Sequence, residues 1–235
     1  MKIRVKFSKH GALKFIGHLD VMRYFQKAIR RAKIDIKYSS GFSPHQIMTF
    51  AAPLGVGLES NGEYMDIEVN SLTSSVQLMN SLNEQMAEGI HILEVCLLPE
   101  HAGNAMASVA AAKYTIRFRE GYRPSFLNTV SINTFYNQTK ITVTKQTKKS
   151  EVTFDMKPFI YECIYDPDLD VIHLTVDASS SGNIKPTLVF KALYEYNHTS
   201  FDEFGLLITR EETYMNLGTP ETLDLKPLGY IGSDY

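Results

Sequence analysis

Residues 7–68 read FSKHGALKFIGHLDVMRYFQKAIRRAKIDIKYSSGFSPHQIMTFAAPLGVGLESNGEYMDIE, and the middle of this segment has the pattern of a basic amphipathic helix. In the run HLDVMRYFQKAIRRAK, apolar side chains recur at helical spacing and are expected to be buried. This expected stripe comprises Leu19, Met22, Phe25, Ile29 and Ala32, with Gln26 as its polar break. The flanking segments have the patterns of strands and ordered loops, which we expect to hold the helix in place.

The expected helix gathers positive charge on one side. At about 100° per residue, its cations fall within an arc of about 100° beside the apolar stripe. These cations are Arg23, Lys27, Arg30 and Arg31. Part of the cluster has a structural explanation, because the helix dipole stabilises cations in the last turn. The pattern nevertheless favours a polyanion-binding surface, so we expect these side chains to point outward and to bind nucleic acid.

The charge balance of the whole chain hides this local concentration. The 235 residues have a formal net charge of -2, yet residues 1–37 contain eleven Lys or Arg and two acidic residues. This region therefore has a balance of +9, and the rest of the chain, with 13 basic and 24 acidic residues, has a balance of -11. A local basic patch is sufficient for phosphate binding. Two alternatives remain, because the patch can also bind an acidic partner protein or the chain's own acidic half.

Composition favours a globular protein that does not enter a membrane. The hydrophobic content of 44% is enough for a packed core. No apolar run reaches the length of about 18 residues that a membrane span needs, and the amino-terminal residues lack the apolar core of a signal peptide. The two cysteines, Cys96 and Cys163, are too few for a disulfide framework. We therefore expect a cytoplasmic location, free thiols and no membrane partner.

The predicted elements divide the chain into two similar units. In residues 1–100 their order is strand, helix, strand, strand, helix, strand, which is the order of the ferredoxin-like βαββαβ fold. Residues 101–112 form a connector, residues 113–215 repeat this order with additional elements, and residues 216–235 form a tail that is either loose or a docking strand. The predicted fold class is therefore α+β, with tandem ferredoxin-like units, antiparallel sheets and a decorated second unit.

Several element boundaries follow from local signals. The first strand, over residues 2–8, alternates in polarity and is expected to have a basic outer face formed by Lys2, Arg4 and Lys6. The second helix is expected to begin after Ser74 or Ser75 as its cap. Two later helices are expected to have Pro124 and Pro186 in their first turns.

Metal and cofactor sites are not expected from the residue pattern. His91 and Cys96 are five residues apart on a predicted strand, so they point to opposite faces, and His101 adds no second thiolate. Two cysteines 67 residues apart do not supply the ligands of an iron-sulfur cluster. We therefore predict that the chain binds no metal and no cofactor of its own.

Three residues around the basic face are candidates for catalysis. A ribonuclease that needs no metal cleaves RNA through the 2′-hydroxyl with general acid and base groups. Side chains suited to these roles are His18, Tyr38 and His45. Each also has a structural alternative: a hydrogen bond at the helix start for His18, core packing for Tyr38 and loop anchoring for His45. Two aromatic residues, Tyr24 and Phe42, are candidates for stacking on unpaired bases.

The same segment resembles the bacterial radical-SAM-linked proteins, a domain of unknown function that occurs beside or fused to radical SAM enzymes. The similarity lies in GHLDVMR, AIRRA, YSSGFSPH and PLGVGLESNGEYMDIE, and it continues in AAAKYTIRF, EVTFDMKPFI and IKPTLVFKAL. The chain departs from the family pattern at Gly17 and Gln26, where we expect Ser and a charged residue. The resemblance implies an accessory protein that engages RNA and has a radical SAM enzyme as its partner.

Three functional hypotheses follow. The first is an RNA- or tRNA-binding accessory protein that uses Arg23, Lys27, Arg30, Arg31 and the loop from Phe42 to His45. The second is a metal-independent endoribonuclease of the tandem ferredoxin-like type, which is supported only by a fold analogy with CRISPR repeat-processing enzymes. The third is a protein-protein adaptor that binds no nucleic acid.

Overall fold

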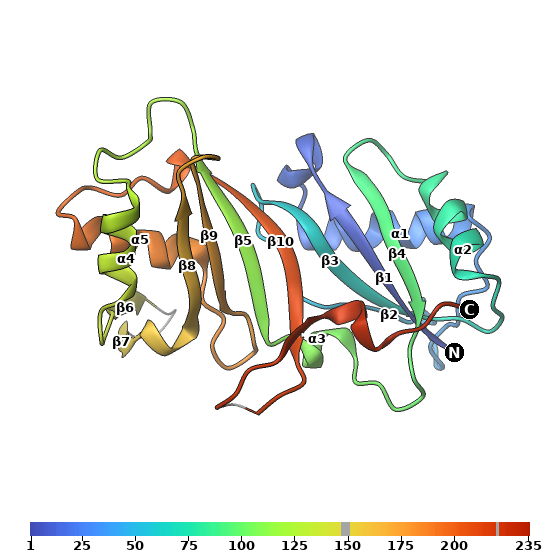
Figure 1. The fold of residues 1–235 in the computed structure, drawn as a ribbon. Coiled ribbons are helices and arrows are strands. Elements are labelled where there is room, and N and C mark those ends of the chain that lie inside the picture. The colour runs from blue at the N-terminus through green and yellow to red at the C-terminus, as the bar shows by residue number, and fades with distance from the viewer. Residues whose placement is uncertain (147–150, 220) are drawn as a thin grey trace. The chain divides into compact units, whose positions relative to one another are not determined.

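The computed structural model describes residues 1–146, 151–219 and 221–235, and it forms an α+β protein. Within these residues there are five α-helices, and the strand pairs are mostly antiparallel (Figure 1). The predicted α+β class is therefore confirmed. The contacts divide the chain into a first unit, residues 1–110 and 210–235, and a second unit, residues 111–209.

The first unit contains an antiparallel sheet with the strand order β4-β1-β3. The short strand β2 pairs with β3, and β11 pairs with β10. The bounds of these strands are β1 Lys2–Lys9, β2 Met48–Phe50, β3 Glu59–Glu68, β4 Ile90–Leu97, β10 Leu206–Asn216 and β11 Leu225–Pro227.

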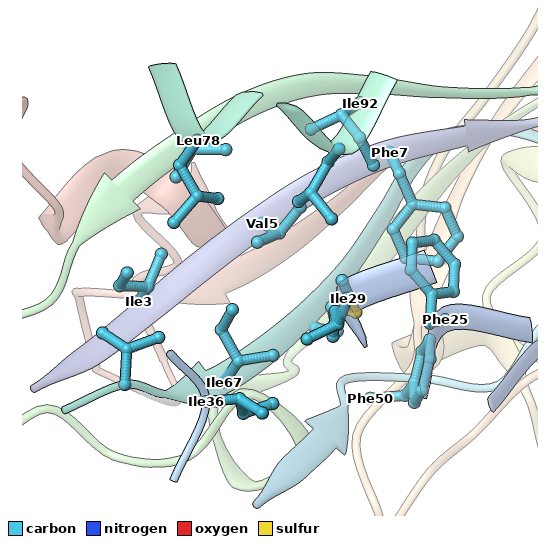
Figure 2. Packing of buried hydrophobic residues seen from close by; sticks show 14 of the residues in the cluster. Ile3, Val5, Phe7, Phe25, Ile29, Ile36, Phe50, Ile67, Leu78 and Ile92 are labelled. Atoms are coloured by element: carbon cyan, nitrogen blue, oxygen red, sulfur yellow. The ribbon is translucent and has the colours of Figure 1, made fainter. Parts of the chain in front are cut away.

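Two helices, α1 (His18–Arg31) and α2 (Ser75–Asn83), contribute to the core of the first unit. Figure 2 shows the central part of this core, where Phe7 of β1 meets Phe25 of α1 and Phe50 of β2. The ring centroids of Phe7 and Phe25 are 4.7 Å apart, and those of Phe25 and Phe50 are 5.8 Å apart. These aromatic contacts fix the position of α1 on the sheet, and with it the direction of the outer face of α1. The short helix α3 (Ala105–Ser108) follows β4.

The buried side of α1 differs in part from the predicted stripe. Val21, Phe25, Ala28 and Ile29 are buried, whereas Leu19, which was expected to be buried, is 60% exposed. The buried residues are spaced i, i+4, i+7 and i+8, and Leu19 lies about 200° around the helix from Val21. A single rotation of the helix therefore cannot bury both, and the larger set of apolar residues is the one buried. The start of α2 agrees with the prediction, because Ser74 and Gln77 form a capping box.

The predicted basic outer face of β1 is not open to solvent. Arg4 is 1% exposed, and its Nε and Nη2 donate to the carboxylate of Asp66 at 2.7 and 3.0 Å. Its Nη1 also donates to the Leu228 carbonyl at 2.8 Å, so the carboxy-terminal segment covers this side of the strand. Lys6 pairs with Glu212 at 2.6 Å. The prediction of a solvent-exposed basic face was wrong for Arg4, because the carboxylate that neutralises it lies opposite it on β3.

The carboxy-terminal residues of the first unit are paired with its other strands. β11 is antiparallel to β10, and Ser233 forms an isolated bridge with Leu97 at the end of β4. The last residue, Tyr235, accepts a hydrogen bond on its carbonyl from the backbone of Ser75 at 3.0 Å. The chain end therefore contacts the first turn of α2.

The second unit contains an antiparallel sheet with the order β5-β9-β8 and a separate hairpin of β6 and β7. The predicted helix start at Pro124 was wrong, because the side chain of Asn128 caps the helix by accepting from the backbone of Ser131. The start at Pro186 is confirmed. The elements are β5 Ala111–Phe118, α4 Thr129–Tyr136, β6 Thr142–Gln146, β7 Glu151–Asp155, β8 Ile160–Asp166, β9 Val171–Asp177 and α5 Pro186–Tyr196.

Candidate functional site

The outer face of α1 presents the four cations that the sequence analysis identified. All four residues are exposed: Arg23, Lys27, Arg30 and Arg31. Relative to the buried residue Phe25, Arg23 and Arg30 lie about 160° and 140° around the helix. The packing of α1 on the sheet therefore directs these side chains to the side away from the core.

Within the part of the chain that the structure describes, the ion pair found for these cations is that of Arg23 with Asp20, at 3.5 Å. Both side chains of this pair are more than 60% exposed, so solvent screens the attraction. Arg30 donates only to the backbone carbonyl of Gln26 at 3.3 Å. The charges of Arg23 and Arg30 are therefore only weakly compensated, and both side chains can bind an anion.

Arg31 is held more firmly than the other three. Its Nη2 donates to the carbonyl of Gln85 at 3.0 Å, and its Nε donates to the Gln85 side chain at 3.3 Å. Tyr24, about two helical turns before it, accepts a hydrogen bond from the backbone N–H of Ala87 at 2.5 Å. Together these contacts fasten α1 to the segment that follows α2. Tyr24 is half-buried, so only part of its ring is available for stacking on a base.

A short hairpin-like loop, residues 38–46, lies beside the middle of α1. Tyr38 and Gln46 form an isolated antiparallel bridge at its base, and the Gln46 side chain donates to the Gln26 carbonyl at 3.2 Å. Arg30 donates to this same carbonyl. The loop therefore contacts α1 at the same carbonyl that Arg30 contacts.

The tip of this loop exposes an aromatic ring, and hydrogen bonds below the tip close the loop. Phe42 is fully exposed, at 109% of the reference area, and Gly41 beside it has a φ of +111° that favours glycine. Below the tip, the backbone of Ser39 donates to the His45 carbonyl at 2.8 Å. The Ser39 hydroxyl accepts from the His45 backbone at 3.1 Å and lies 2.9 Å from His45 Nδ1. His45 therefore helps to close the loop, while Tyr38 is 48% exposed at its base.

The three catalytic candidates do not form one constellation. His18 packs edge-on against the ring of Phe50, with centroids 5.2 Å apart. It lies eight residues before Gln26, the contact point of the loop, which corresponds to about 12 Å along the helix axis. Tyr38 and His45 are both on the loop, but Tyr38 faces Gln46 and His45 faces Ser39 across it.

A group of buried charges near His18 was missed by the sequence analysis. Lys9 is 2% exposed and Glu63 is 5% exposed, and with His18 they line a small cavity of about 20 Å³. Lys9 Nζ donates to the Ile16 carbonyl at 3.1 Å, and burial lowers the pKa of Lys9 while Glu63 opposes this shift. A period of two through Ile3, Val5 and Phe7 also places position 9 on the core face, and this signal was available in the sequence.

Arg210 completes this buried group. Its Nη1 lies 3.1 Å from Glu63 Oε1, but it donates its hydrogen bond to the Ala52 carbonyl at 2.8 Å, so the contact with Glu63 is electrostatic. The group thus contains two cations and one carboxylate in a space that admits about one water molecule. It is too small for a substrate, and we interpret it as part of the packing of the first unit.

Metal-binding clusters and membrane-spanning helices are both absent from the residues that the structure describes. No set of three or more His, Cys, Asp or Glu side chains lies close enough to hold a metal ion in residues 1–146, 151–219 and 221–235. None of the helices in these same ranges combines the length and the apolar character needed to span a bilayer.

The fold and the site define a mixed α+β protein with a mostly antiparallel sheet and an exposed cationic helix. Residues 2–186 match a family model described as an uncharacterized protein conserved in bacteria (DUF2344), and the chain belongs to this family. This finding confirms the expected membership in a bacterial family of unknown function. Comparison with curated proteins gives no match.

Proposed function

We propose that this protein binds RNA or tRNA as an accessory protein of a radical SAM enzyme. The observation that carries the RNA part is the placement of exposed cations on α1 beside a loop whose Phe42 is fully exposed. Exposed lysine and arginine side chains bind phosphates irrespective of the nucleotide sequence, and exposed aromatic rings stack on unpaired bases.

The spacing of the cations suits a row of phosphates. Arg23, Lys27 and Arg30 follow one another at about 6 and 4.5 Å along the helix axis, on one side of the helix. The hydrogen bonds that close the loop reduce its freedom before binding, which lowers the entropic cost of ordering it on RNA. Stacking of one base on Phe42 would add about 1–3 kcal/mol.

The strand order supports the proposal that each unit has a ferredoxin-like fold. In the first unit, β4-β1-β3 with β2 beside β3 is the order expected of a ferredoxin-like βαββαβ unit. In the second unit, β5, α4, β8, β9 and α5 follow the same succession, and the β6–β7 hairpin is an insertion. We propose that both units are of this type and that the second is the decorated one.

The partner part of the proposal rests on the resemblance of GHLDVMR, YSSGFSPH and the neighbouring motifs to radical-SAM-linked proteins. A radical SAM enzyme holds its iron-sulfur cluster with cysteine thiolates. This chain has two cysteines, and both are buried, so we assign the radical chemistry to the partner and RNA binding to this chain.

The test is a titration of labelled tRNA and of a labelled single-stranded RNA by fluorescence anisotropy. We compare the wild type with Arg23→Gln/Lys27→Gln and with a matched control, Arg117→Gln/Lys140→Gln, which removes two exposed cations of the second unit. The α1 variant is expected to weaken binding, and to make the slope of log K against log salt shallower by about 1.4 for single-stranded RNA. The control is expected to retain the wild-type slope.

Two results would separate the alternatives. Cleavage of the RNA in the presence of chelator, lost in His45→Ala, would favour an endoribonuclease. No binding of either RNA at low salt would refute the RNA proposal and leave an adaptor that binds protein only.

A further inference from the structure

A cavity of the second unit lies beside the first half of α5 and has a volume of about 430 Å³. The cavity shares no residue with the cationic surface on α1. Its polar lining consists of Lys145, Lys185, Thr187, Lys191 and Glu203, and its apolar lining consists of Leu188 and Phe201. A volume of this size is in the range of small-molecule sites, which is about 300–1,000 Å³.

The cations of this cavity come from two separate elements. Lys145 belongs to β6, whereas Lys185 is the residue before the first turn of α5 and Lys191 lies in the middle of this helix. All three lysines are exposed, and among the described residues that line the cavity the carboxylate that opposes them is that of Glu203. Lys191 also lies 3.9 Å from Glu195, but both side chains are more than half exposed, so this pair is weak. The cavity therefore has an excess of positive charge.

The start of α5 adds to this excess. A helix amino terminus carries a partial positive charge and normally has Ser, Thr, Asp or Asn as its cap. Here the cap is Lys185, whose side chain makes no capping hydrogen bond. A cation at this end is unfavourable in the helix alone, and a bound anion would relieve it. The Thr187 hydroxyl on the first turn supplies an additional donor.

The apolar wall of the cavity is held in place by aromatic packing. The ring of Phe201 lies 5.1 Å from that of Tyr194, and the Tyr194 ring lies 5.0 Å from that of Phe126. Phe201 is half-buried, so one part of its ring remains available to a ligand. A flat ring that is fixed before binding is a suitable stacking surface for a base.

We propose that this cavity binds a nucleoside phosphate, with the phosphate among the three lysines of its lining and the base against Phe201 and Leu188. The shared chemistry is a phosphate joined to an aromatic base. It is present both in a free nucleotide and in the 5′-phosphorylated end of an RNA, so the test includes both sources.

The test is isothermal titration of the full chain at low salt with AMP, ATP, adenosine and inorganic phosphate. We expect ATP to bind more tightly than AMP, since it brings more negative charge to the lysines, and adenosine and phosphate alone to bind at least tenfold more weakly than AMP. Lys185→Gln and Lys191→Gln are each expected to weaken AMP binding at least fivefold. The matched control Lys140→Gln, an exposed lysine of the same unit, should leave it unchanged.

Phe201→Leu separates the base site from the phosphate site. This variant should weaken the binding of AMP but leave the affinity for inorganic phosphate unchanged. The unchanged phosphate affinity also shows that the variant is folded. A short RNA with a 5′-phosphate, compared with the same RNA carrying a 5′-hydroxyl, tests the second source of the ligand. This comparison is made in the Arg23→Gln/Lys27→Gln background, so that loss of the α1 surface and loss of this cavity are distinguished.

Equal binding of adenosine and AMP would overturn the proposal, as would AMP binding that survives both lysine variants. Failure of AMP and ATP to bind at millimolar concentration would overturn it as well, whatever the result of the RNA titration on α1.

Discussion

Replacing Arg4 by methionine should strongly destabilise the first unit, because Arg4 is the most completely buried charged residue among the described residues of that unit. Its side chain is 0% exposed, and that of its partner Asp66 is 5% exposed. The variant removes two hydrogen bonds to Asp66, one to the Leu228 carbonyl and a longer one, of 3.4 Å, to the Gly103 carbonyl. Asp66 would keep the hydrogen bond from the backbone of Ala105, but its charge would be buried without a counterion.

Removing one partner of a buried ion pair costs about 3–5 kcal/mol, and this is the loss we expect for Arg4→Met. The matched control is Lys37→Met, which breaks the exposed pair of Lys37 with Glu68 and should cost less than about 1 kcal/mol. The double variant Arg4→Met/Asp66→Leu should recover part of the stability, since it removes the unpaired carboxylate together with its partner.

The assay is urea unfolding followed by far-UV circular dichroism, because the chain has no tryptophan. Hydrogen exchange supplies a local measurement, since the loss of the bond to Leu228 should increase exchange at the carboxy-terminal segment, including the Ser233 amide that donates to Leu97. A loss of stability for Arg4→Met no greater than that for Lys37→Met would refute the reasoning. So would a double variant less stable than Arg4→Met.

Two further predictions concern titration. Burial raises the pKa of Cys96 to about 11 and that of Cys163 to about 12, so neither thiol should react measurably with a disulfide reagent at pH 8 until the protein unfolds; rapid reaction of one equivalent in the native state would contradict this. Burial lowers the pKa of Lys9 in the folded protein below its unfolded value of 10.5, so the unfolded state binds more protons between these two values and the free energy of unfolding should rise with pH there. Lys9→Met should reduce this rise in urea titrations at several pH values below 10, and an unchanged slope would show that Lys9 is not its source.

The RNA and nucleotide proposals use different parts of the chain, and the variants that test them are separate. The α1 surface consists of exposed cations and an exposed ring, so it is suited to a long polyanion that covers an open face. The α5 cavity is concave and has a fixed aromatic wall, so it is suited to one small ligand. Either proposal can fail while the other stands.

Local patterns in the sequence were sufficient for α1, for the starts of α2 and α5 and for the cationic face of α1, but not for the start of α4. Helix periodicity, the cap at Ser74 or Ser75 and the proline at Pro186 depend on residues within about four positions of one another, and the structure has the corresponding elements. The outward direction of Arg23, Lys27 and Arg30 follows from the same periodicity once one side of α1 is buried.

The partners of the buried charges depended on contacts that no local pattern contains. Arg4 meets Asp66 and Leu228, which are 62 and 224 positions away in the chain, so its alternating strand pattern was compatible with an exposed basic face. The cavity at α5 likewise gathers Lys145, Lys185 and Phe201 from separate segments. The neighbours of a residue in the sequence determine the direction in which its side chain can point. The free-energy cost of burying its charge is determined by groups that come close only in the folded protein.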